Sequence, residues 1–437
     1  MRRTRIVGGR VIDPARGVDQ VLDVVVEGGR VVGMAQETGA AAGEVVIDAR
    51  GLVVAPGFVD LHCHLREPGY EHKETIATGT AAALAGGFTT VCAMPNTLPT
   101  IDTASDVAYV QDVARRLGLA RVQVIGTVTK GQQGQELSEM ADMAQAGAVA
   151  FSDDGRQVAT SRLMRHALEY SLLTGRPIVD HCEDADLAAG TVMNEGPVSA
   201  RLGLPGVPAE AEEIAVARDL ALARLTGGRL HVAHVSTRAA ARLIERAKEE
   251  GIRVSAEVTP HHLLLTDDWL AGAHATPPYD ARCRVNPPLR SAEDCEALQW
   301  ALGAGVIDCI ATDHAPHARV DKECELGAAA PGISGLETAF GLLMRLVHTG
   351  RIPLATLIAR LTCDPARVFG LDAGSLRPGA AADLVLLDPL AEWTVDAARF
   401  RSKGKNTPLD GERLHGRVVL TMVNGTVAHQ LEAQVHG

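Results

Sequence analysis

The sequence has few aromatic residues, no long basic run and no long hydrophobic run. Phe, Trp and Tyr make up only 3% of its 437 residues, so stacking platforms for single-stranded nucleic acid are not expected. Lys and Arg number 42 against 54 Asp and Glu, and the net charge of -12 argues against nucleic acid or anionic membranes as partners. No apolar stretch approaches the roughly 20 residues of a transmembrane helix. We therefore expect a soluble protein.

The eight cysteines lack the spacing of a disulfide framework. None forms a Cys-x-x-Cys pair, and Cys92, Cys182 and Cys309 lie in apolar runs, where cysteine behaves as a small hydrophobic residue. Residues 1–5 are basic, but no hydrophobic region of a signal peptide follows them. These features predict a reduced, cytoplasmic protein.

The two ends of the chain resemble each other and differ from the middle. Residues 4–54 and 374–430 contain short strand-like runs separated by Gly, Asp and Asn, a pattern typical of a small β-sandwich. Neither end has enough strands for a sandwich of its own, so we predict that the two ends pair. The predicted division is a β-sandwich built from 1–54 and 366–437, with an inserted domain at 55–365.

The middle of the chain alternates β-branched runs with Ala-rich helical patterns, which is typical of a parallel sheet with crossover helices. Helices are predicted at 75–86, 136–146, 210–226 and 236–250. Eight strand-like runs are present: Val53–Leu61, Thr89–Met94, Val122–Val128, Ala148–Ser152, Pro177–Asp180, Leu230–Val235, Arg253–Val258 and Ile307–Ala311. Eight β/α units over about 310 residues predict a (β/α)₈ barrel of the α/β class, because a doubly wound sheet would suit six or seven strands better.

Polar residues that can bind a metal follow several of these runs. A (β/α)₈ barrel carries its active site at the C-terminal ends of its strands. His62 and His64 are two residues apart and therefore share one face of the first strand. The candidates at the strand ends are His62, His64, Asp153 or Asp154, His181, His234 and Asp313. Such nitrogen and oxygen ligands suit Zn²⁺, with Mn²⁺ or Co²⁺ as substitutes, and six of them fit two ions that share a bridging carboxylate.

Other residues near the barrel mouth are not expected to bind metal. Cys63 lies between His62 and His64 and should point away from them. Lys130, at the end of the third strand, is predicted to face solvent in a loop. The loops Gly131–Gln135 and Asp321–Gly332 are each either a cover for the mouth or an ordinary surface loop.

Six short motifs, spread over most of the chain, together indicate a protein family. They are residues 56–69, 93–97, 151–155, 234–237, 286–290 and 311–317. Together they resemble the motifs of the cyclic amidohydrolases, and in particular those of the dihydroorotase family, over nearly the whole chain. The resemblance implies an amidohydrolase barrel and a zinc-dependent hydrolase. The implied reaction is the reversible cyclisation of N-carbamoyl-L-aspartate to L-dihydroorotate and water in pyrimidine (UMP) biosynthesis.

The resemblance also implies how the ligands are divided. The first ion would take His62, His64 and Asp313, the second would take His181 and His234, and Asp154 would bridge them. The two ions would activate a hydroxide, with Asp313 as acid and base. Many relatives carry a carbamylated lysine as the bridge, whereas this chain has two aspartates there. It is similar in this to the longer bacterial dihydroorotases, which argues against a hydantoinase, an allantoinase or a dihydropyrimidinase.

The substrate contacts also follow from the resemblance. Arg66 offers a planar fork for the substrate carboxylate, and a surface salt bridge with Glu67 is the alternative. The other implied contacts are His64, Leu65, Asn96, Asn286, His317, Pro331 and Gly332, whereas His314 is expected to be structural.

The sequence leaves the assembly of the protein open. A homodimer, association with aspartate transcarbamoylase, and a role as a catalytically inactive partner of that enzyme are all compatible with it. An inactive homologue would be expected to lose metal ligands, and here every ligand position is filled.

Overall fold

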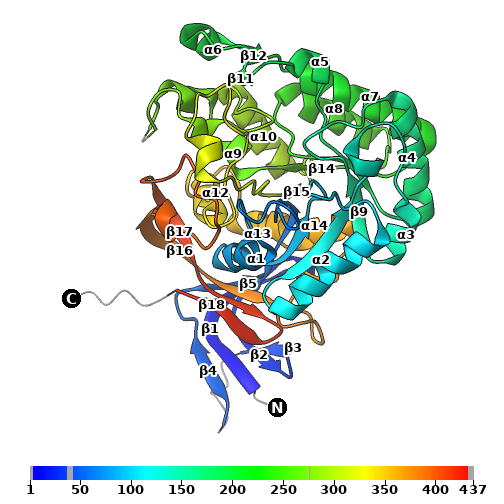
Figure 1. The fold of residues 1–437 in the computed structure, drawn as a ribbon. Helices are drawn as coiled ribbons and strands as arrows, with labels where there is room; N and C mark the ends of the chain where they lie inside the picture. Colours follow the sequence, from blue (N-terminus) through cyan, green and yellow to red (C-terminus); the bar gives the residue numbers. More distant parts are fainter. Residues whose placement is uncertain (1–2, 37–42, 275, 432–437) are drawn as a thin grey trace.

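A computed structural model describes residues 3–36, 43–274 and 276–431. Its centre is a sheet of eight parallel strands in the order β15-β14-β13-β10-β9-β8-β7-β6 (Figure 1). The strands are β6 (Phe58–Cys63), β7 (Phe88–Ala93), β8 (Arg121–Gly126), β9 (Ala148–Ser152), β10 (Ile178–Asp180), β13 (Leu230–Val232), β14 (Val254–Val258) and β15 (Cys309–Ile310). A parallel bridge between Cys63 and His314 joins the first strand to the segment after the last. The sheet therefore closes, and the predicted barrel is confirmed.

The two ends of the chain form a second sheet beside the barrel, as predicted (Figure 1). Its strands are β1 (Arg3–Asp13), β2 (Val18–Glu27), β3 (Arg30–Ala35), β4 (Val45–Asp48), β5 (Val53–Pro56), β16 (Leu384–Thr394), β17 (Arg413–Val423) and β18 (Thr426–Gln430). The ends meet where β5 pairs antiparallel with β16. A core cluster that includes Ile6, Val24, Leu384 and Leu420 joins both ends of the chain.

The run Val53–Leu61 was expected to be one strand, and this expectation is wrong. It contains two strands, β5 in the terminal sheet and β6 in the barrel, separated at Gly57. Gly57 donates its N–H to the Asp383 carbonyl, and a Cβ at this position would lie 2.1 Å from Thr89 Oγ1. Only glycine fits at this close passage between the two sheets.

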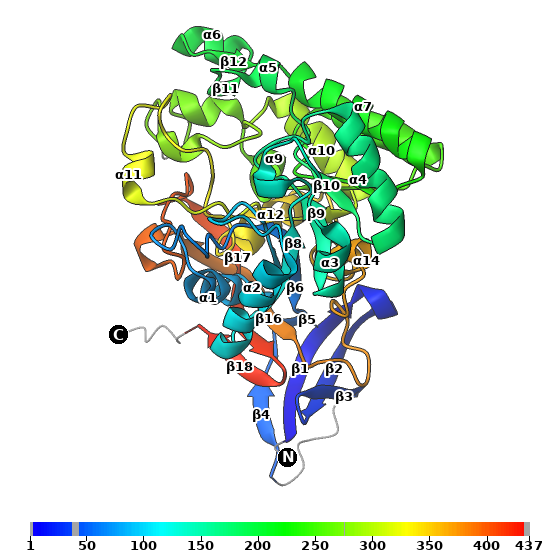
Figure 2. The same ribbon diagram turned by 45° about the vertical axis from the view of Figure 1, so that its right-hand side comes forward.

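Helices cover the outside of the barrel, and Figure 2 shows α2, α3 and α4 side by side along it. The longer helices are α1 (Ile76–Ala85), α2 (Ala104–Leu117), α4 (Ser161–Thr174), α7 (Glu210–Thr226), α8 (Arg238–Glu249), α10 (Ala292–Ala304), α12 (Ala339–His348), α13 (Leu354–Leu361) and α14 (Cys363–Phe369). Shorter helical turns are α3 (Met140–Gln145), α5 (Ala185–Ala188), α6 (Pro197–Leu202), α9 (Pro260–Leu264) and α11 (Arg319–Lys322). A two-stranded ladder, β11 (Met193–Asn194) with β12 (Gly206–Val207), lies between α5 and α7 along the chain.

The predicted helices correspond to α1, α3, α7 and α8. Side-chain caps set several starts, since Thr75 and Thr237 accept hydrogen bonds from the backbone N–H groups of the first turns of α1 and α8. Helix α3 is shorter than predicted because Ser138 donates its backbone N–H to the Val128 carbonyl at 2.9 Å. No helix in the described part of the chain combines the length and hydropathy that a membrane crossing needs.

Hydrophobic side chains fill the part of the barrel interior that lies away from its functional end. One buried cluster takes side chains from β6, β7, β8, β9, β10 and β15, including Leu61, Ile125 and Val179, together with Phe369 of α14. Because these strands lie around the whole barrel, their shared cluster fills its interior. Helix α14 spans the predicted domain boundary at 365 and packs against the barrel through Phe369. The domain division stays a prediction.

Candidate active site

The six predicted metal ligands lie together at the C-terminal ends of the barrel strands. β6 carries His62 and leads to His64, β9 leads to Asp154, β10 to His181, β13 to His234 and β15 to Asp313. All six side chains are buried. They surround the floor of a cavity of about 210 Å³, whose lining includes His64, Asp154, His181, His234 and Asp313. The cavity is therefore at the end of the barrel where parallel α/β sheets bind ligands.

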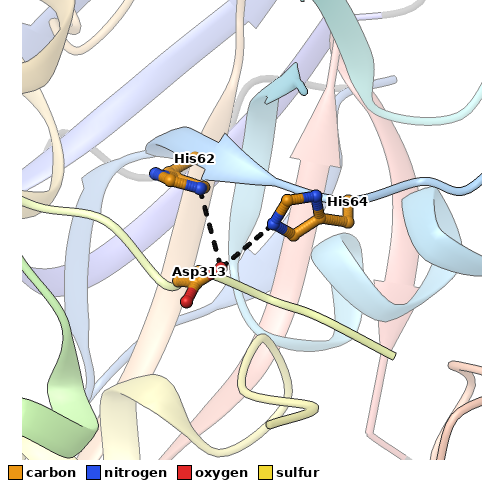
Figure 3. A group of neighbouring side chains, drawn as sticks. All are labelled: His62, His64 and Asp313. Carbon is orange, nitrogen blue, oxygen red and sulfur yellow. Dashed lines mark hydrogen bonds and ion pairs between the residues drawn. The ribbon is translucent and has the colours of Figure 1, made fainter. Parts of the chain in front are cut away.

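His62, His64 and Asp313 form the first part of this cluster. Figure 3 shows both imidazoles directed at one carboxylate oxygen of Asp313. The distances to Asp313 Oδ1 are 3.6 Å from His62 Nε2 and 3.1 Å from His64 Nε2. Ligand atoms of the three residues lie within 4.8 Å of one another, which is compact enough for one ion.

Asp154 joins this part of the cluster to the second. Its Oδ1 lies 3.4 Å from His62 Nε2, 3.4 Å from His234 Nε2 and 3.7 Å from His181 Nδ1. Its Oδ2 lies 3.5 Å from His64 Nε2. The Asp154 carboxylate is thus within 4 Å of all four imidazoles, which is the position that a bridging ligand requires.

The neighbouring Asp153 has a different environment. Its Oδ1 accepts the backbone N–H groups of Val128 and Thr129 at 2.9 and 3.0 Å, and its Oδ2 accepts the Thr129 hydroxyl. The sequence left open which of the two aspartates faces the cluster. The structure directs Asp154 into it and uses Asp153 to fix the segment after β8.

The buried charges shift one another's pKa values. Burial alone would raise the pKa of Asp154, but the surrounding histidines hold it well below its usual value. Burial would likewise raise the pKa of Asp313, and His64 and His62 lower it instead. Both carboxylates are therefore ionised, which is the form that binds a cation.

The donor set also fits a metal in its geometry. The buried Nε2 of His62 has no hydrogen-bond partner among the described residues, although it faces two carboxylates. His181 Nδ1 and His234 Nε2 lie 3.0 Å apart and both face Asp154. Imidazole nitrogens and carboxylate oxygens converging in this way match the ligand preferences of Zn²⁺, and also those of Mn²⁺ and Co²⁺.

The backbone is strained at three residues around the cavity. Arg66, His234 and Asp313 have positive φ angles of 60°, 32° and 44°. Such angles cost free energy in residues other than glycine and concentrate at functional sites, where the surrounding structure enforces them.

A buried polar chain behind the cluster was not found in the sequence. His62 Nδ1 lies 2.8 Å from Glu257 Oε1, whose second oxygen lies 3.1 Å from His231 Nε2. His231 Nδ1 in turn lies 2.9 Å from Ser255 Oγ. The carboxylate can only accept from His62, so it fixes the tautomer that leaves Nε2 free to face the cluster. An acidic residue inside the predicted strand Arg253–Val258 was the signal available.

His64 is oriented in the same way by Asn96. The His64 Nδ1 lies 2.9 Å from Asn96 Oδ1, and this amide oxygen can only accept a hydrogen bond. The His64 Nε2 is therefore left to face Asp313 and Asp154. Asn96 also lines the cavity, as expected of a substrate contact.

Arg66 and His317 form another part of the cavity wall. Arg66 donates from Nε to the Pro316 carbonyl at 3.3 Å, and its Nη2 lies 3.4 Å from His317 Nε2. The alternative salt bridge with Glu67 is absent, since Glu67 accepts the Ile76 N–H instead. Among the described residues Arg66 has no carboxylate partner, so its guanidinium is available to an anion in the cavity.

The cavity wall also contains Asn286, Pro331 and Gly332. Asn286 Nδ2 lies 3.0 Å from Glu183 Oε2 and 3.1 Å from His181 Nε2. Glu183, two residues after His181, was not predicted from the sequence. Gly332 has a φ of +146°, and a Cβ there would lie 2.7 Å from the Ala315 carbonyl oxygen.

Some predicted residues lie outside the cavity. Leu65 is buried in the core around the barrel and its side chain is not part of the lining. Cys63 packs into the same core, as predicted. Lys130 is exposed and pairs with Glu136 at 2.7 Å, which confirms its place in a surface loop. His314 is structural as expected, with its Nε2 3.4 Å from Glu74 Oε2.

The two mouth loops differ in how they are fixed. In Gly131–Gln135, backbone N–H groups bond to side chains, Gly131 to Asp102 Oδ2 at 2.8 Å and Gly134 to Thr129 Oγ1 at 3.0 Å. In Asp321–Gly332, the buried Lys322 ammonium donates to the carbonyls of Ala281 and Arg284 at 2.9 and 3.0 Å. The second loop is therefore anchored where it leaves α11.

A closed parallel barrel with histidines and aspartates at its C-terminal mouth is the architecture of the amidohydrolases. Among solved structures, L-hydantoinase (dihydropyrimidinase) from Arthrobacter aurescens matches with a TM-score of 0.87 at 28% identity, covering 98% of this chain and 96% of that one. Dihydropyrimidinase from Brevibacillus agri matches with a TM-score of 0.83 at 25% identity, covering 98% and 95%.

The sequence comparisons narrow the class to one family. A profile described as Dihydro-orotase-like matches residues 51–240. A dihydroorotase from Anaeromyxobacter dehalogenans is 53% identical over 97% of both chains, and one from Syntrophus aciditrophicus is 46% identical over 97% of this chain and 98% of its own. The chain belongs to the dihydroorotase family.

Proposed function

We propose that this chain catalyses the reversible cyclisation of N-carbamoyl-L-aspartate to L-dihydroorotate and water, a step of pyrimidine biosynthesis. One observation carries the proposal: a single cavity combines a cation-binding cluster with a guanidinium that lacks a carboxylate partner among the described residues. The cluster suits the opening of a cyclic amide. The Arg66 guanidinium suits the carboxylate that dihydroorotate carries and that dihydrouracil and hydantoin lack. The named relatives support the same reaction.

The cluster is assigned to two Zn²⁺ ions, with Mn²⁺ or Co²⁺ as substitutes. One ion would be held by His62, His64 and Asp313 and the other by His181 and His234, with Asp154 shared. When bound, such ions would lower the pKa of a water between them and polarise the carbonyl to be attacked.

Asp313 is the proposed acid and base. Its carboxylate is ionised, lies 3.1 Å from His64 Nε2 and lines the cavity. In the hydrolytic direction it would take the proton of the attacking water and deliver it to the leaving ring nitrogen. In the biosynthetic direction the same carboxylate would accept a proton from the ureido nitrogen as that nitrogen attacks the substrate carboxylate carbon, and would deliver it to the departing oxygen, which with one solvent proton leaves as water.

The part of the cavity wall that contains Arg66 and His317 would bind and orient the substrate carboxylate. Arg66 presents its guanidinium beside His317, whose pKa is lowered to about 3 by burial and by the charge of Arg66. His317 is therefore neutral, and Arg66 provides the positive charge of this pair. Asn96 would add an amide contact, while Asn286 and the main chain at Pro331 and Gly332 would face the ring amides.

The test is a parallel assay of metal-replete protein on L-dihydroorotate, dihydrouracil, hydantoin and allantoin, with metal content measured on the same sample. The proposal predicts fast opening of dihydroorotate alone and close to two ions per chain. Comparable rates on the uncharged rings would refute the carboxylate assignment. Inactivity on all four with both ions bound would refute the proposed reaction.

A further inference from the structure

A short segment of the C-terminal region connects the sheet formed by the two chain ends to the active-site end of the barrel. We call residues 401–407, between the 3₁₀ turn Ala397–Arg399 and β17, the clasp segment. Its side chains alternate between exposed Lys403 and Lys405 and the buried Ser402, Asn406 and Thr407. A polar segment buried in this way must find its hydrogen-bond partners inside the protein.

Asn406 finds its partners in the two loops that border the cavity. Its Nδ2 donates to the carbonyls of Ala315 and Gly332, each at 3.0 Å. Its Oδ1 accepts the backbone N–H of His317 and the hydroxyl of Ser334, each at 2.9 Å. Both donors and both acceptor positions of one buried amide are thus used, and they join residues 315–317 to residues 332–334.

The clasp segment is itself held at its other end. Ser402 donates its hydroxyl to Glu74 Oε2 at 2.5 Å, and Glu337 accepts the backbone N–H groups of Arg401 and Ser402 at 2.9 and 3.1 Å. Gly404 packs so closely on the next loop that a Cβ would lie 2.5 Å from Pro316 Cβ. Asn406 is therefore fixed in place before it contacts the cavity loops.

The loops that Asn406 joins carry the groups proposed for substrate binding. His317 lines the cavity, and the Pro316 carbonyl accepts the Arg66 Nε at 3.3 Å. A displacement of residues 315–317 would therefore move the His317 ring and release Arg66 at the same time. Gly332 lines the same wall and is bound through its carbonyl oxygen.

We propose that Asn406 is a positioning residue for substrate affinity, which holds Arg66 and His317 in the geometry that binds the substrate carboxylate and Gly332 in the position that faces the ring amides. A residue of the C-terminal region, outside the barrel strands, would thereby support the part of the cavity wall that binds the substrate carboxylate. The inference rests on the proposed function, because it takes Arg66 and His317 as substrate contacts. Asn406 contacts none of the six metal-cluster residues in the described structure, so its effect should fall on KM.

The first test replaces the amide by its isostere in Asn406→Asp. The carboxylate can still accept from His317 and Ser334, but it places an oxygen against two carbonyl oxygens. The expected result is a KM for L-dihydroorotate raised by about tenfold or more, with kcat within about threefold and an unchanged metal content. The matched control is Lys405→Ala, which removes hydrogen bonds to the carbonyls of Phe400, just before the clasp segment, and Ser402 within it, and should change neither constant.

A milder variant keeps the test valid if Asn406→Asp does not fold. Ser334→Ala removes one of the four hydrogen bonds and should raise KM by about twofold to fivefold at constant kcat. A wild-type KM in Ser334→Ala and in any folded Asn406 variant, or a loss confined to kcat, would overturn the inference. Arg66→Lys is measured alongside. If it raises KM and these variants do not, only the role of Asn406 fails. If it leaves KM unchanged, the proposed carboxylate site fails.

Discussion

The two walls of the cavity are built in different ways. The metal wall, formed by the six cluster residues, stands on or directly after barrel strands, and the register of the closed sheet fixes it. The carboxylate wall, formed by Arg66 and His317, stands on loops, and hydrogen bonds from distant parts of the chain fix it. Rigid strands hold the groups that perform chemistry, whereas loops hold the groups that select the substrate. Changes to the first wall should therefore lower metal content or turnover, and changes to the second should raise KM.

The largest effect is expected at the centre of the metal wall. Asp313→Ala removes both the proposed acid–base group and a ligand, so kcat should fall by more than about 10³-fold. Turnover of L-dihydroorotate at saturating substrate is the measurement. Near-normal turnover would show that Asp313 is not the acid–base group. The metal wall would then have no assigned catalytic residue.

The adjacent aspartates provide a matched pair for the next prediction. Asp154→Asn should lose at least one ion per chain, because the shared carboxylate would no longer be charged. Asp153→Asn should keep both ions, since its oxygens bind only the segment after β8. Metal analysis after gel filtration measures the difference. Equal metal content in the two variants would contradict the assignment of the bridge.

The polar chain behind the metal wall should have a smaller effect. Glu257→Gln removes the charge that orients His62, and metal affinity should weaken by about tenfold to a hundredfold. Ser255→Ala, at the far end of the same chain, should leave the affinity unchanged. Competition with a chelator measures both. An unaltered affinity in Glu257→Gln would show that the strand register alone orients His62.

The carboxylate wall should respond in KM alone. Arg66→Lys exchanges a planar fork for a point charge and loses about one charge-assisted hydrogen bond, so KM should rise by about tenfold with kcat little changed. Arg156→Lys is the control, because the Arg156 side chain is exposed and makes just one weak hydrogen bond within the described residues, to the Gln132 carbonyl at 3.5 Å. Steady-state kinetics separates the two constants. A fall in kcat without a rise in KM would show that Arg66 contributes to turnover and not to substrate binding.

The sequence predicts the metal wall far better than the carboxylate wall, and the reason is physical. Strand ends and period-two alternation already place His62, His64, His181, His234 and Asp313 at one mouth. Alternation cannot choose between Asp153 and Asp154, because the chain leaves β9 at Ser152, before both aspartates, and the choice is set by hydrogen bonds to the segment after β8.

Contacts between distant segments were beyond sequence reasoning. Asn406 lies 89 residues from His317 along the chain and 74 from Gly332, and nothing in its local pattern marks it as part of the site. Glu257 was visible as an acid in a predicted strand, but its partner His62 is 195 residues away. The run Val53–Leu61 failed as one strand for a related reason, since the passage at Gly57 depends on Asp383 and Thr89.

The most direct test of the two-wall account is a crystal structure of the metal-loaded protein with L-dihydroorotate. The account predicts the substrate carboxylate on Arg66, beside His317, with the ring amide turned toward Asp313 and the histidine cluster. A carboxylate bound instead at the histidine cluster, with Arg66 facing solvent or a protein carboxylate, would contradict it.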